Sequence, residues 1–263
     1  MNTTHLKITN GIAHLVWDNP PQNRMSPGVM TGFETAIATI QQDSNVRAVV
    51  FSSTGSNFSF GGDITIWPGV SPEEMANRIR KSLARTNLLE QLPIPVIAAV
   101  QGKCAGGGFE YVLRSDVIIA EEQATFRHPE QTLGVFTLLG GVQRVAERAG
   151  KTRAMKWALT AEEVPAREML EAGVITEVVS NGQALARAME WARVLCDGPT
   201  QAHAAHKELL RQWSTGGVAK ADASIPDLTQ KIFATRDAQM GVQSAVNALT
   251  QGVERPTLTF SGV

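Results

Sequence analysis

Short apolar runs rich in β-branched residues recur through the first two thirds of the chain, and they constrain its fold more than any other feature. Each run has the length of a buried strand and is too short to span a bilayer. The runs cover residues 12–17, 48–51, 96–100 and 117–120. Segments with helical periodicity lie between them. Strands that alternate with helices favour an α/β domain with largely parallel strand pairing.

Two helix starts stand out between these runs. Ser26 and Pro27 have the order of an N-cap followed by proline at the first helical position, and apolar residues then recur on one helical face. Ser71 begins a second such segment with Pro72 and Glu74, where the glutamate three residues after the serine is typical of a capping box. We therefore expect helices that begin at residues 27 and 72.

The strand pattern ends after about residue 179, and the remainder has helical patterns only. With a turn around Gly198, we expect helices in the segments 183–195, 200–213, 228–233 and 240–249. We divide the chain into an α/β core, residues 1–197, and a C-terminal helical region, residues 198–263. Apolar side chains in this region need a partner surface, either its own core or a neighbouring subunit; they include Trp213, Ile232 and Phe233.

The 263 residues have an ordinary globular composition, with 43% apolar and 19% charged residues. The net charge of −1, with lysine and arginine dispersed, gives no electrostatic basis for nucleic acid or an anionic membrane as main partner. Cys104 and Cys196 lie far apart without CxxC spacing, which argues against a disulfide framework or zinc site and suits a reducing cytosol. Residues 1–7 lack the apolar segment of a signal peptide. We expect a cytoplasmic protein without bound metal.

Two glycine-rich segments follow buried strands. Phe58–Asp63 contains Gly61-Gly62, and taken alone it is most simply a turn that ends in an aspartate cap. Gly102–Glu110 contains three consecutive glycines before a helix-like stretch, a place where backbone N–H groups are exposed beside a positive helix N-terminus. Neither segment has the GxxxxGK[ST] spacing of a phosphate loop or the GxGxxG spacing of a dinucleotide site. A phosphate loop and a dinucleotide-binding oxidoreductase are therefore disfavoured.

A third segment, residues 125–134, carries Glu130 directly after a proline and His128 two residues before it. Taken alone, Glu130 is most simply a solvated carboxylate and His128 a surface or hydrogen-bonded histidine. In this order, however, the three segments resemble the crotonase superfamily, also called the enoyl-CoA hydratase/isomerase family. The resemblance runs from about Ile12 to Val179 and continues more weakly to the C-terminus. The matching positions are Asn23, Gly61–Asp63, Pro93–Gly102, Ala105–Glu110, Ser115–Val117, Phe126, Pro129–Glu130, Leu133–Gly134, Gly140–Arg144, Leu159–Thr160 and Glu171–Val179.

The resemblance implies a fold and a reaction. The fold is a spiral of ββα repeats followed by helices that form homotrimers, often paired into a dimer of trimers. The reaction passes through a thioester enolate whose oxygen is held by two backbone N–H groups, matched here by Gly62 and Gly107. Hydratases of the family use two glutamates, matched by Glu110, which would act on water, and Glu130, which would serve the α-carbon. Coenzyme A enters as part of the acyl thioester substrate, so neither a separate cofactor nor a metal is implied.

Three residues depart from the hydratase pattern. Leu138 replaces a small residue of a common proline-glycine pair, Phe60 stands where a small residue is usual, and His128 occupies a stretch that is usually small or apolar. We expect these residues to shape the acyl pocket toward a substrate other than a short crotonyl-type chain. With the adenine contacts implied at Asp63 and Ile64, the expected substrate-binding residues are Phe60, Asp63, Ile64, His128, Gly134 and Leu138.

The leading interpretation is an enoyl-CoA hydratase, which adds water in syn geometry to a 2-enoyl-CoA and gives 3-hydroxyacyl-CoA. Alternatives on the same fold are other enolate reactions, namely Δ3-Δ2 enoyl-CoA isomerisation, decarboxylation or C–C hydrolysis. Isomerisation needs one base and the exclusion of water, which the bulk of Leu138 would suit. A non-catalytic binding protein is a further alternative, and the two glutamates and two glycine donors count against it.

Overall fold

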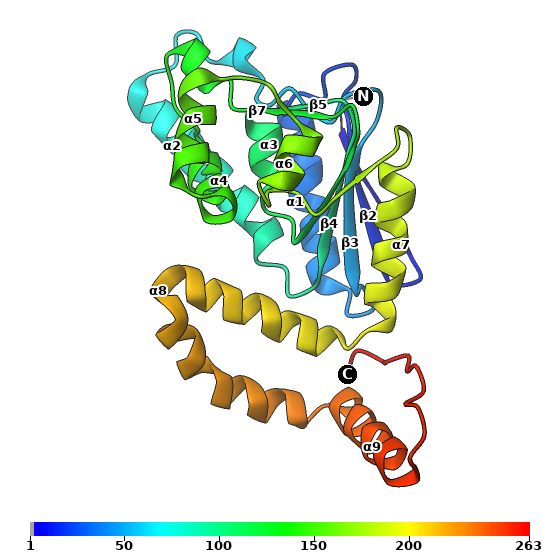
Figure 1. Cartoon of the computed structure of the whole chain (residues 1–263). Helices are drawn as coiled ribbons and strands as arrows, with labels where there is room; N and C mark the ends of the chain where they lie inside the picture. Colours follow the sequence, from blue (N-terminus) through cyan, green and yellow to red (C-terminus); the bar gives the residue numbers. More distant parts are fainter. Residues whose placement is uncertain (1–2) are drawn as a thin grey trace.

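The centre of the molecule is a six-stranded sheet with strand order β1-β2-β3-β4-β6-β9 (Figure 1). The structure is a computed structural model that describes residues 3–263, so Met1 and Asn2 of the predicted core lie outside the described residues. β1 and β2 pair antiparallel, and every later neighbour pairs in parallel. The four predicted strands and the largely parallel pairing are confirmed. The strands are β1 (Thr3–Thr9), β2 (Ile12–Asp18), β3 (Ala48–Ser53), β4 (Val96–Val100), β6 (Val117–Glu121) and β9 (Glu177–Val179).

The two predicted helix starts are confirmed to the residue. Helix α1 (Pro27–Gln42) has Ser26 as its N-cap, and α2 (Pro72–Glu90) has Ser71, whose Oγ accepts the N–H of Glu74 at 3.2 Å. The second hydrogen bond of the predicted capping box, from the Ser71 N–H to the Glu74 carboxylate, is absent among the described contacts. The Glu74 carboxylate instead accepts from Arg78 one turn later, at 2.9 Å, a spacing that brings side chains together on a helix surface.

A second, small sheet joins the parts of the chain that matter most for the site. It has the order β5-β7-β8, with β5 (Lys103–Ala105) parallel to β7 (Thr125–Arg127), and β7 antiparallel to β8 (Val164–Pro165). Strands of two or three residues carry too little periodicity to be recognised in a sequence, and none of the three was predicted. The parallel pair places the ends of β5 and β7 at the same edge of the small sheet.

Helices cover both faces of the central sheet. Helix α7 (Ala184–Asp197) lies on one face, where its alanines pack on side chains from β3, β4 and β6. Helices α1 and α3 (Gly107–Val112) lie on the other face, over the larger core cluster (Figure 1). The remaining elements of this part are the 3-10 helices η1 (Ile64–Ile66) and η2 (Glu130–Leu133), and the helices α4 (Gly141–Ala149), α5 (Lys151–Thr160) and α6 (Ala166–Glu171).

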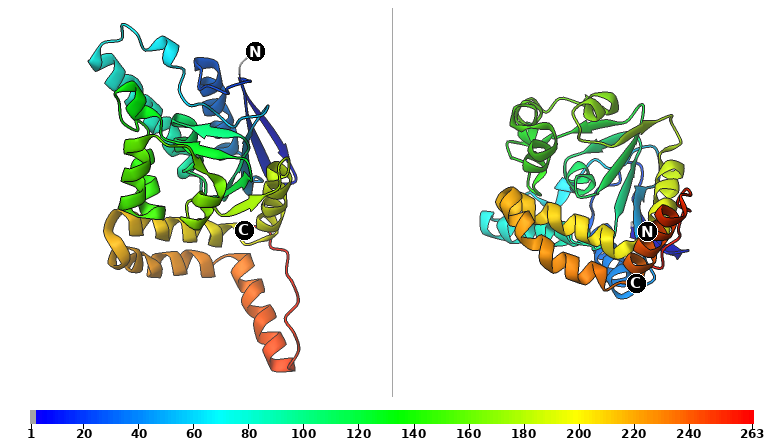
Figure 2. Two further views of the ribbon diagram at one scale, coloured as in Figure 1. Left: turned by 45° about the horizontal axis from the view of Figure 1, so that its top comes forward. Right: turned by 60° about the horizontal axis from the view of Figure 1, so that its bottom comes forward.

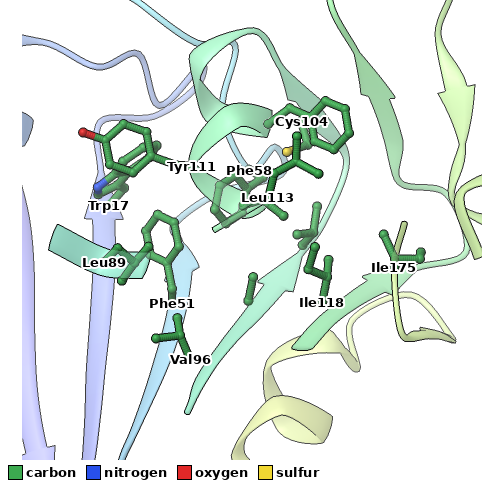
Figure 3. Packing of buried hydrophobic residues seen from close by; sticks show 14 of the residues in the cluster. Trp17, Phe51, Phe58, Leu89, Val96, Cys104, Tyr111, Leu113, Ile118 and Ile175 are labelled. Atoms are coloured by element: carbon green, nitrogen blue, oxygen red, sulfur yellow. The ribbon is translucent and has the colours of Figure 1, made fainter. Parts of the chain in front are cut away.

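An aromatic cluster fills the larger core beneath the glycine-rich loops. Trp17 is fully buried, and its ring lies 5.0 Å from both Phe51 and Tyr111 in edge-on geometry, an arrangement that aromatic pairs prefer. Phe58 packs against Phe51 at 5.2 Å. Figure 3 shows these rings together between the sheet and α3. The residue Phe58 therefore anchors the start of the Gly61-Gly62 loop to the core.

The C-terminal helices form an arm, whose first part lies along one end of the core and whose last helix extends away from it (Figure 2). Helix α8 (Thr200–Phe233) breaks at Gly217, where φ is +72°, and its second half runs back beside the first before α9 (Arg236–Gln251). The predicted helices at 200–213 and 228–233 are confirmed as helical, but the second begins far earlier than predicted, because the helix resumes after Gly217 and accommodates Pro226. The large apolar side chains of this region are not buried in a core of their own, since Trp213, Phe233 and Leu249 are 43%, 63% and 82% exposed. Within residues 3–263, no helix has both the length and the apolar character of a membrane crossing.

Candidate active site

Two glycine-rich loops meet because their flanking residues pair as strands. The N–H of Ala105 donates to the carbonyl of Ser59 at 2.8 Å, and the N–H of Ser59 donates to Lys103 at 3.1 Å. This pairing sets Gly61 against Gly107: an added Cβ on Gly61, whose φ is +88°, would lie 2.9 Å from the Gly107 nitrogen. Only glycine tolerates both that conformation and that approach.

Gly62 and Gly107 line the same cavity, and the backbone N–H of neither residue donates a hydrogen bond to any residue from 3 to 263. The Gly62 peptide is held from behind, because Arg24 donates to its carbonyl at 3.0 Å and the N–H of Met25 donates to Gly61 at 2.9 Å. Gly107 is the first residue of α3, where helix N–H groups have no intrahelical partner. The result is a pair of fixed donors suited to an oxyanion.

Asn23 ties these loops to the sheet, as a buried residue with φ of +46°. Its side-chain amide donates to the carbonyls of Thr54 and Asn57, at 2.6 and 2.8 Å. Its own carbonyl accepts from the hydroxyl of Ser59 at 2.7 Å, and that hydroxyl accepts the N–H of Gly61 at 3.0 Å. Asn23 thus holds the Gly61-Gly62 loop in place indirectly, through Ser59.

Glu110 lies in the first turn of α3 and is only 1% exposed. Its Oε1 accepts the N–H groups of Leu139 and Gly141, both at 2.8 Å. Burial raises the pKa of Glu110, and these two hydrogen bonds oppose the rise by stabilising the charged form. The backbone carbonyl of Glu110 accepts from buried Arg114 at 2.7 Å, and Arg114 also donates to the carbonyl of Leu139. Arg114 therefore holds together the helix and the loop that meet at this carboxyl group.

Glu130 is the first residue of η2 and is 7% exposed. Burial, and then the nearby charge of Glu110, raise its pKa to about 7. Its Oε1 lies 3.4 Å from where a Cβ on Gly106 would stand, whereas its Oε2 is buried without a partner among the described residues. A carboxyl group with a pKa near neutrality both gives and takes a proton readily at that pH.

The small sheet brings the two glutamates together. Glu110 follows the end of β5 by five residues and Glu130 follows the end of β7 by three, and these ends are neighbours. The N–H of Gly106 donates to the carbonyl of Arg127 at 3.0 Å and continues the pairing toward the site. Carboxyl groups twenty residues apart in the chain thereby line one cavity.

The cavity has a volume of about 530 Å³ and lies between these loops, α1 and α2. Both glutamates, both glycine donors and four of the six expected substrate-binding residues line it, namely Phe60, Asp63, Ile64 and Leu138. Gly134 does not line it; this exposed glycine ends η2 with φ of +71°. His128 does not line it either. The histidine is 2% exposed and packs on Phe109, so the expected surface histidine was wrong, and neither ring nitrogen makes a hydrogen bond to the described residues as the structure stands.

Comparison with known proteins identifies the family. The family model described as enoyl-CoA hydratase/isomerase matches residues 7–250. A probable mitochondrial enoyl-CoA hydratase of Dictyostelium discoideum is 33% identical over 194 residues, which is 73% of this chain and 68% of that protein. A probable enoyl-CoA hydratase of Rhizobium meliloti (strain 1021) is 30% identical over 245 residues, 92% of this chain and 95% of that protein.

The chain belongs to the enoyl-CoA hydratase/isomerase family.

Solved structures agree with the fold expected of the enoyl-CoA hydratase/isomerase family. An enoyl-CoA hydratase subunit I from Geobacillus kaustophilus HTA426 superposes with a TM-score of 0.89 at 25% identity, covering 99% of this chain and 98% of that one. An enoyl-CoA hydratase from Bacillus anthracis superposes with a TM-score of 0.88 at 23% identity, covering 99% and 100%. The predicted crotonase-type α/β fold is therefore confirmed.

Several residues of the site in this family member were not predicted from the sequence. The N–H groups of Leu139 and Gly141 bind Glu110, and Arg114 holds that arrangement, but a backbone donor leaves no signal in its side chain. Basic residues also gather along the cavity from segments that are distant in the chain, which is why lysine and arginine looked dispersed; these are Arg24, Arg78, Lys81, Arg85, Lys103 and Arg127. Among residues 3–263, no group of three His, Cys, Asp or Glu side chains could hold a metal ion.

Proposed function

We propose that the protein hydrates a 2-enoyl-CoA thioester in syn geometry and gives 3-hydroxyacyl-CoA. One observation carries the proposal: Gly62 and Gly107, whose N–H groups have no partner in the described part of the chain, line one cavity with two buried carboxyl groups, Glu110 and Glu130. Curated relatives named probable enoyl-CoA hydratase, at 27–33% identity, support the same reaction. Coenzyme A is then part of the substrate, and the chemistry needs no separate cofactor and no metal.

The thioester oxygen binds between the N–H groups of Gly62 and Gly107. Attack at C3 moves negative charge onto that oxygen, and two preoriented donors favour the resulting enolate over the ground state, each contributing about 3 kcal/mol. Neither glycine carries a side chain that would crowd the acyl group. The thioester therefore needs to approach along the line where the two loops meet.

Glu110 activates the water and Glu130 serves the α-carbon. The Oε1 of Glu110 is already occupied by two N–H groups, so its remaining oxygen is the one available to accept a proton from water. Glu130, with a pKa of about 7, starts in part protonated near neutral pH and delivers its proton to C2. Because burial and mutual repulsion couple the two carboxyls, they titrate as a pair.

The coenzyme A end of the substrate lies, in this proposal, at the mouth of the cavity. Asp63 and Ile64 line the cavity and are assigned to the adenine. Basic residues on α2 and the small sheet line the same cavity and are suited to the phosphates. The acyl group then faces the apolar wall, which includes Phe60 and Leu138.

We further propose a homotrimer or a dimer of trimers in the cytoplasm. The C-terminal arm exposes a succession of large apolar side chains, more than single surface residues explain. They include Trp213, Val218, Ile225, Phe233, Val242, Val246 and Leu249. Sedimentation velocity tests the assembly.

A second candidate is Δ3-Δ2 enoyl-CoA isomerisation, which the position of Leu138 in the cavity wall favours. Isomerisation moves a proton between C2 and C4 with one base, for which Glu130 suffices, and it proceeds best where bulk excludes water. Decarboxylation and C–C hydrolysis have no comparable observation in their favour.

The deciding experiment incubates the protein with a panel of 2-enoyl- and 3-enoyl-CoA thioesters and follows the conjugated-enone absorbance. Hydration consumes that absorbance, whereas isomerisation of a 3-enoyl substrate creates it. Glu110→Gln should abolish hydration and Glu130→Gln should abolish both reactions. Hydration that survives intact in Glu110→Gln contradicts the proposal.

A further inference from the structure

His128 is a buried polar side chain beside the site that the proposed mechanism leaves unused. Its ring is 2% exposed and stacks on Phe109 with centroids 4.9 Å apart. Neither ring nitrogen has a partner within residues 3–263. Leaving two polar atoms of an imidazole buried and unpaired is unfavourable, so such a group calls for an explanation.

The imidazole lies between the two carboxyl groups. On one side, Nδ1 is 3.9 Å from Oε2 of Glu130, and that oxygen is itself buried and unpartnered among the described residues. On the other side is Gly141, where an added Cβ would lie 2.5 Å from Cε1 of His128 and 2.9 Å from Cγ of Glu110. Gly141 therefore lies against both the imidazole and the Glu110 side chain, and the imidazole is close to both glutamates.

Nδ1 of His128 and Oε2 of Glu130, which lie near one another without hydrogen-bond partners among the described residues, can act as donor and acceptor. A neutral imidazole carries one N–H donor, and an ionised carboxylate only accepts. The 3.9 Å separation is about 1 Å longer than a charge-assisted hydrogen bond, so forming that bond requires the Glu130 carboxyl group to turn toward the ring. The other oxygen of Glu130, Oε1, faces Gly106 of the oxyanion loop.

We propose that His128 is a positioning residue, which donates from Nδ1 to Oε2 of ionised Glu130 and so leaves Oε1 to face the α-carbon of the substrate. The hydrogen bond forms when Glu130 has lost its proton and is released when the proton returns. This assignment rests on the proposed function only in naming the α-carbon as the reacting atom; the hydrogen bond itself needs no substrate.

The electrostatic surroundings agree with this role. Burial lowers the pKa of His128 to about 4, so the imidazole is neutral at physiological pH and acts as a donor without adding charge. The ionisable group that acts on Glu130 from a neighbouring element is Glu110 on α3, which raises the Glu130 pKa; Arg114 and Arg144 act on Glu110. A donor to the charged form of Glu130 offsets part of that rise.

The test measures the Glu130 pKa directly, without substrate. Protein labelled with ¹³C at the glutamate carboxyl is titrated by NMR, and Glu130→Gln assigns the resonance. We expect His128→Leu, which removes the donor, to raise the Glu130 pKa by about one unit. His128→Asn keeps an amide donor close to the position of Nδ1 and should restore the pKa, whereas His128→Gln places its donor near Nε2 and should not.

His203 on α8 supplies the matched control, because its Nδ1 is also buried without a partner in the described structure, far from the cavity lining. His203→Leu should leave the Glu130 pKa unchanged. An unchanged Glu130 pKa in His128→Leu overturns the proposal. An equal Glu130 pKa in His128→Asn and His128→Gln also overturns it, and this second comparison can be made even if His128→Leu fails to fold. If the wild-type protein turned over no enoyl-CoA thioester while the Glu130 pKa still changed as expected in the His128 variants, only the proposed function would be contradicted.

The catalytic consequence is read from α-proton exchange of a saturated acyl-CoA in D₂O, which uses Glu130 as a base. Since the ionised form is the active one, the pH at which exchange reaches half its maximum should rise by about the same unit in His128→Leu. A role in packing alone would change stability and leave this pH profile in place.

Discussion

Glu110 has a structural role and a proposed chemical role that two substitutions separate. Its Oε1 accepts the N–H groups of Leu139 and Gly141, both at 2.8 Å. In Glu110→Gln the amide oxygen accepts both N–H groups in the same place, so only the ionisable group is lost. In Glu110→Ala the acceptor is lost as well, and two buried N–H groups remain without a partner.

The expected magnitudes follow from those contacts. A buried N–H left unpaired costs about 1–3 kcal/mol, so Glu110→Ala should lower the free energy of unfolding by about 2–6 kcal/mol. Glu110→Gln should change it by less than about 1 kcal/mol, because the acceptor remains and a buried charge is removed. Both variants should lose about 10²–10⁴-fold in hydration rate, since neither supplies a base.

Urea unfolding followed by tryptophan fluorescence measures the stabilities, and enone absorbance measures the rates. Glu171→Gln is the matched control: this carboxylate is exposed on α6, and both quantities should stay at the wild-type value. Equal destabilisation by glutamine and alanine would refute the assigned hydrogen bonds. Full activity in Glu110→Gln would refute the assigned base.

Three further perturbations test other parts of the structure. Gly141→Ala should cost about 1–3 kcal/mol of stability and lower turnover more than substrate affinity, because the new Cβ displaces Glu110 and His128; unfolding and steady-state kinetics measure both. Between about pH 4.5 and 7 the native state binds a proton at Glu130 that the unfolded chain does not, so stability attributable to this group falls as pH rises, on the order of 3 kcal/mol in total. The difference in unfolding free energy between wild type and Glu130→Gln measures this fall. The contribution of His128, whose lowered pKa makes stability rise with pH between about pH 4 and 6.5, is common to both proteins and cancels in the difference. A difference that does not change with pH contradicts the raised pKa of Glu130. Leu249→Asp should shift sedimentation toward smaller species if the exposed arm packs between subunits, and an unchanged distribution would place the interface elsewhere.

The main strands and the first helices were predictable because their signals are local. Val96–Val100 is a continuous apolar run, and Ser26-Pro27 is a capping pattern that acts within one turn, so neither depends on distant residues. β1 was missed because only Thr4, Leu6 and Ile8 alternate inward, among polar neighbours. The helix after Gly217 was underestimated because its apolar residues face outward and do not form a core-facing stripe.

The site was predictable in its membership more than in its geometry. The ordered motifs placed Glu110, Glu130, Gly62 and Gly107 together, and all four line the cavity. The sequence could not reveal that Glu110 is held by backbone N–H groups, because those donors come from a loop some thirty residues later. For the same reason, the burial of His128 depends on tertiary packing and was not visible in a segment that begins with charged and polar residues.

The loop from Gly134 to Gly141 has a consequence for anyone who tries to redesign this protein. Leu138 lines the acyl cavity, and the next residue, Leu139, donates its N–H to the proposed base. A selection for new acyl groups would first change Leu138. Any backbone shift at Leu138 would also move Leu139, the next residue, and so disturb the hydrogen bond from the Leu139 N–H to Glu110. Substrate range and turnover should therefore trade off in variants of this loop.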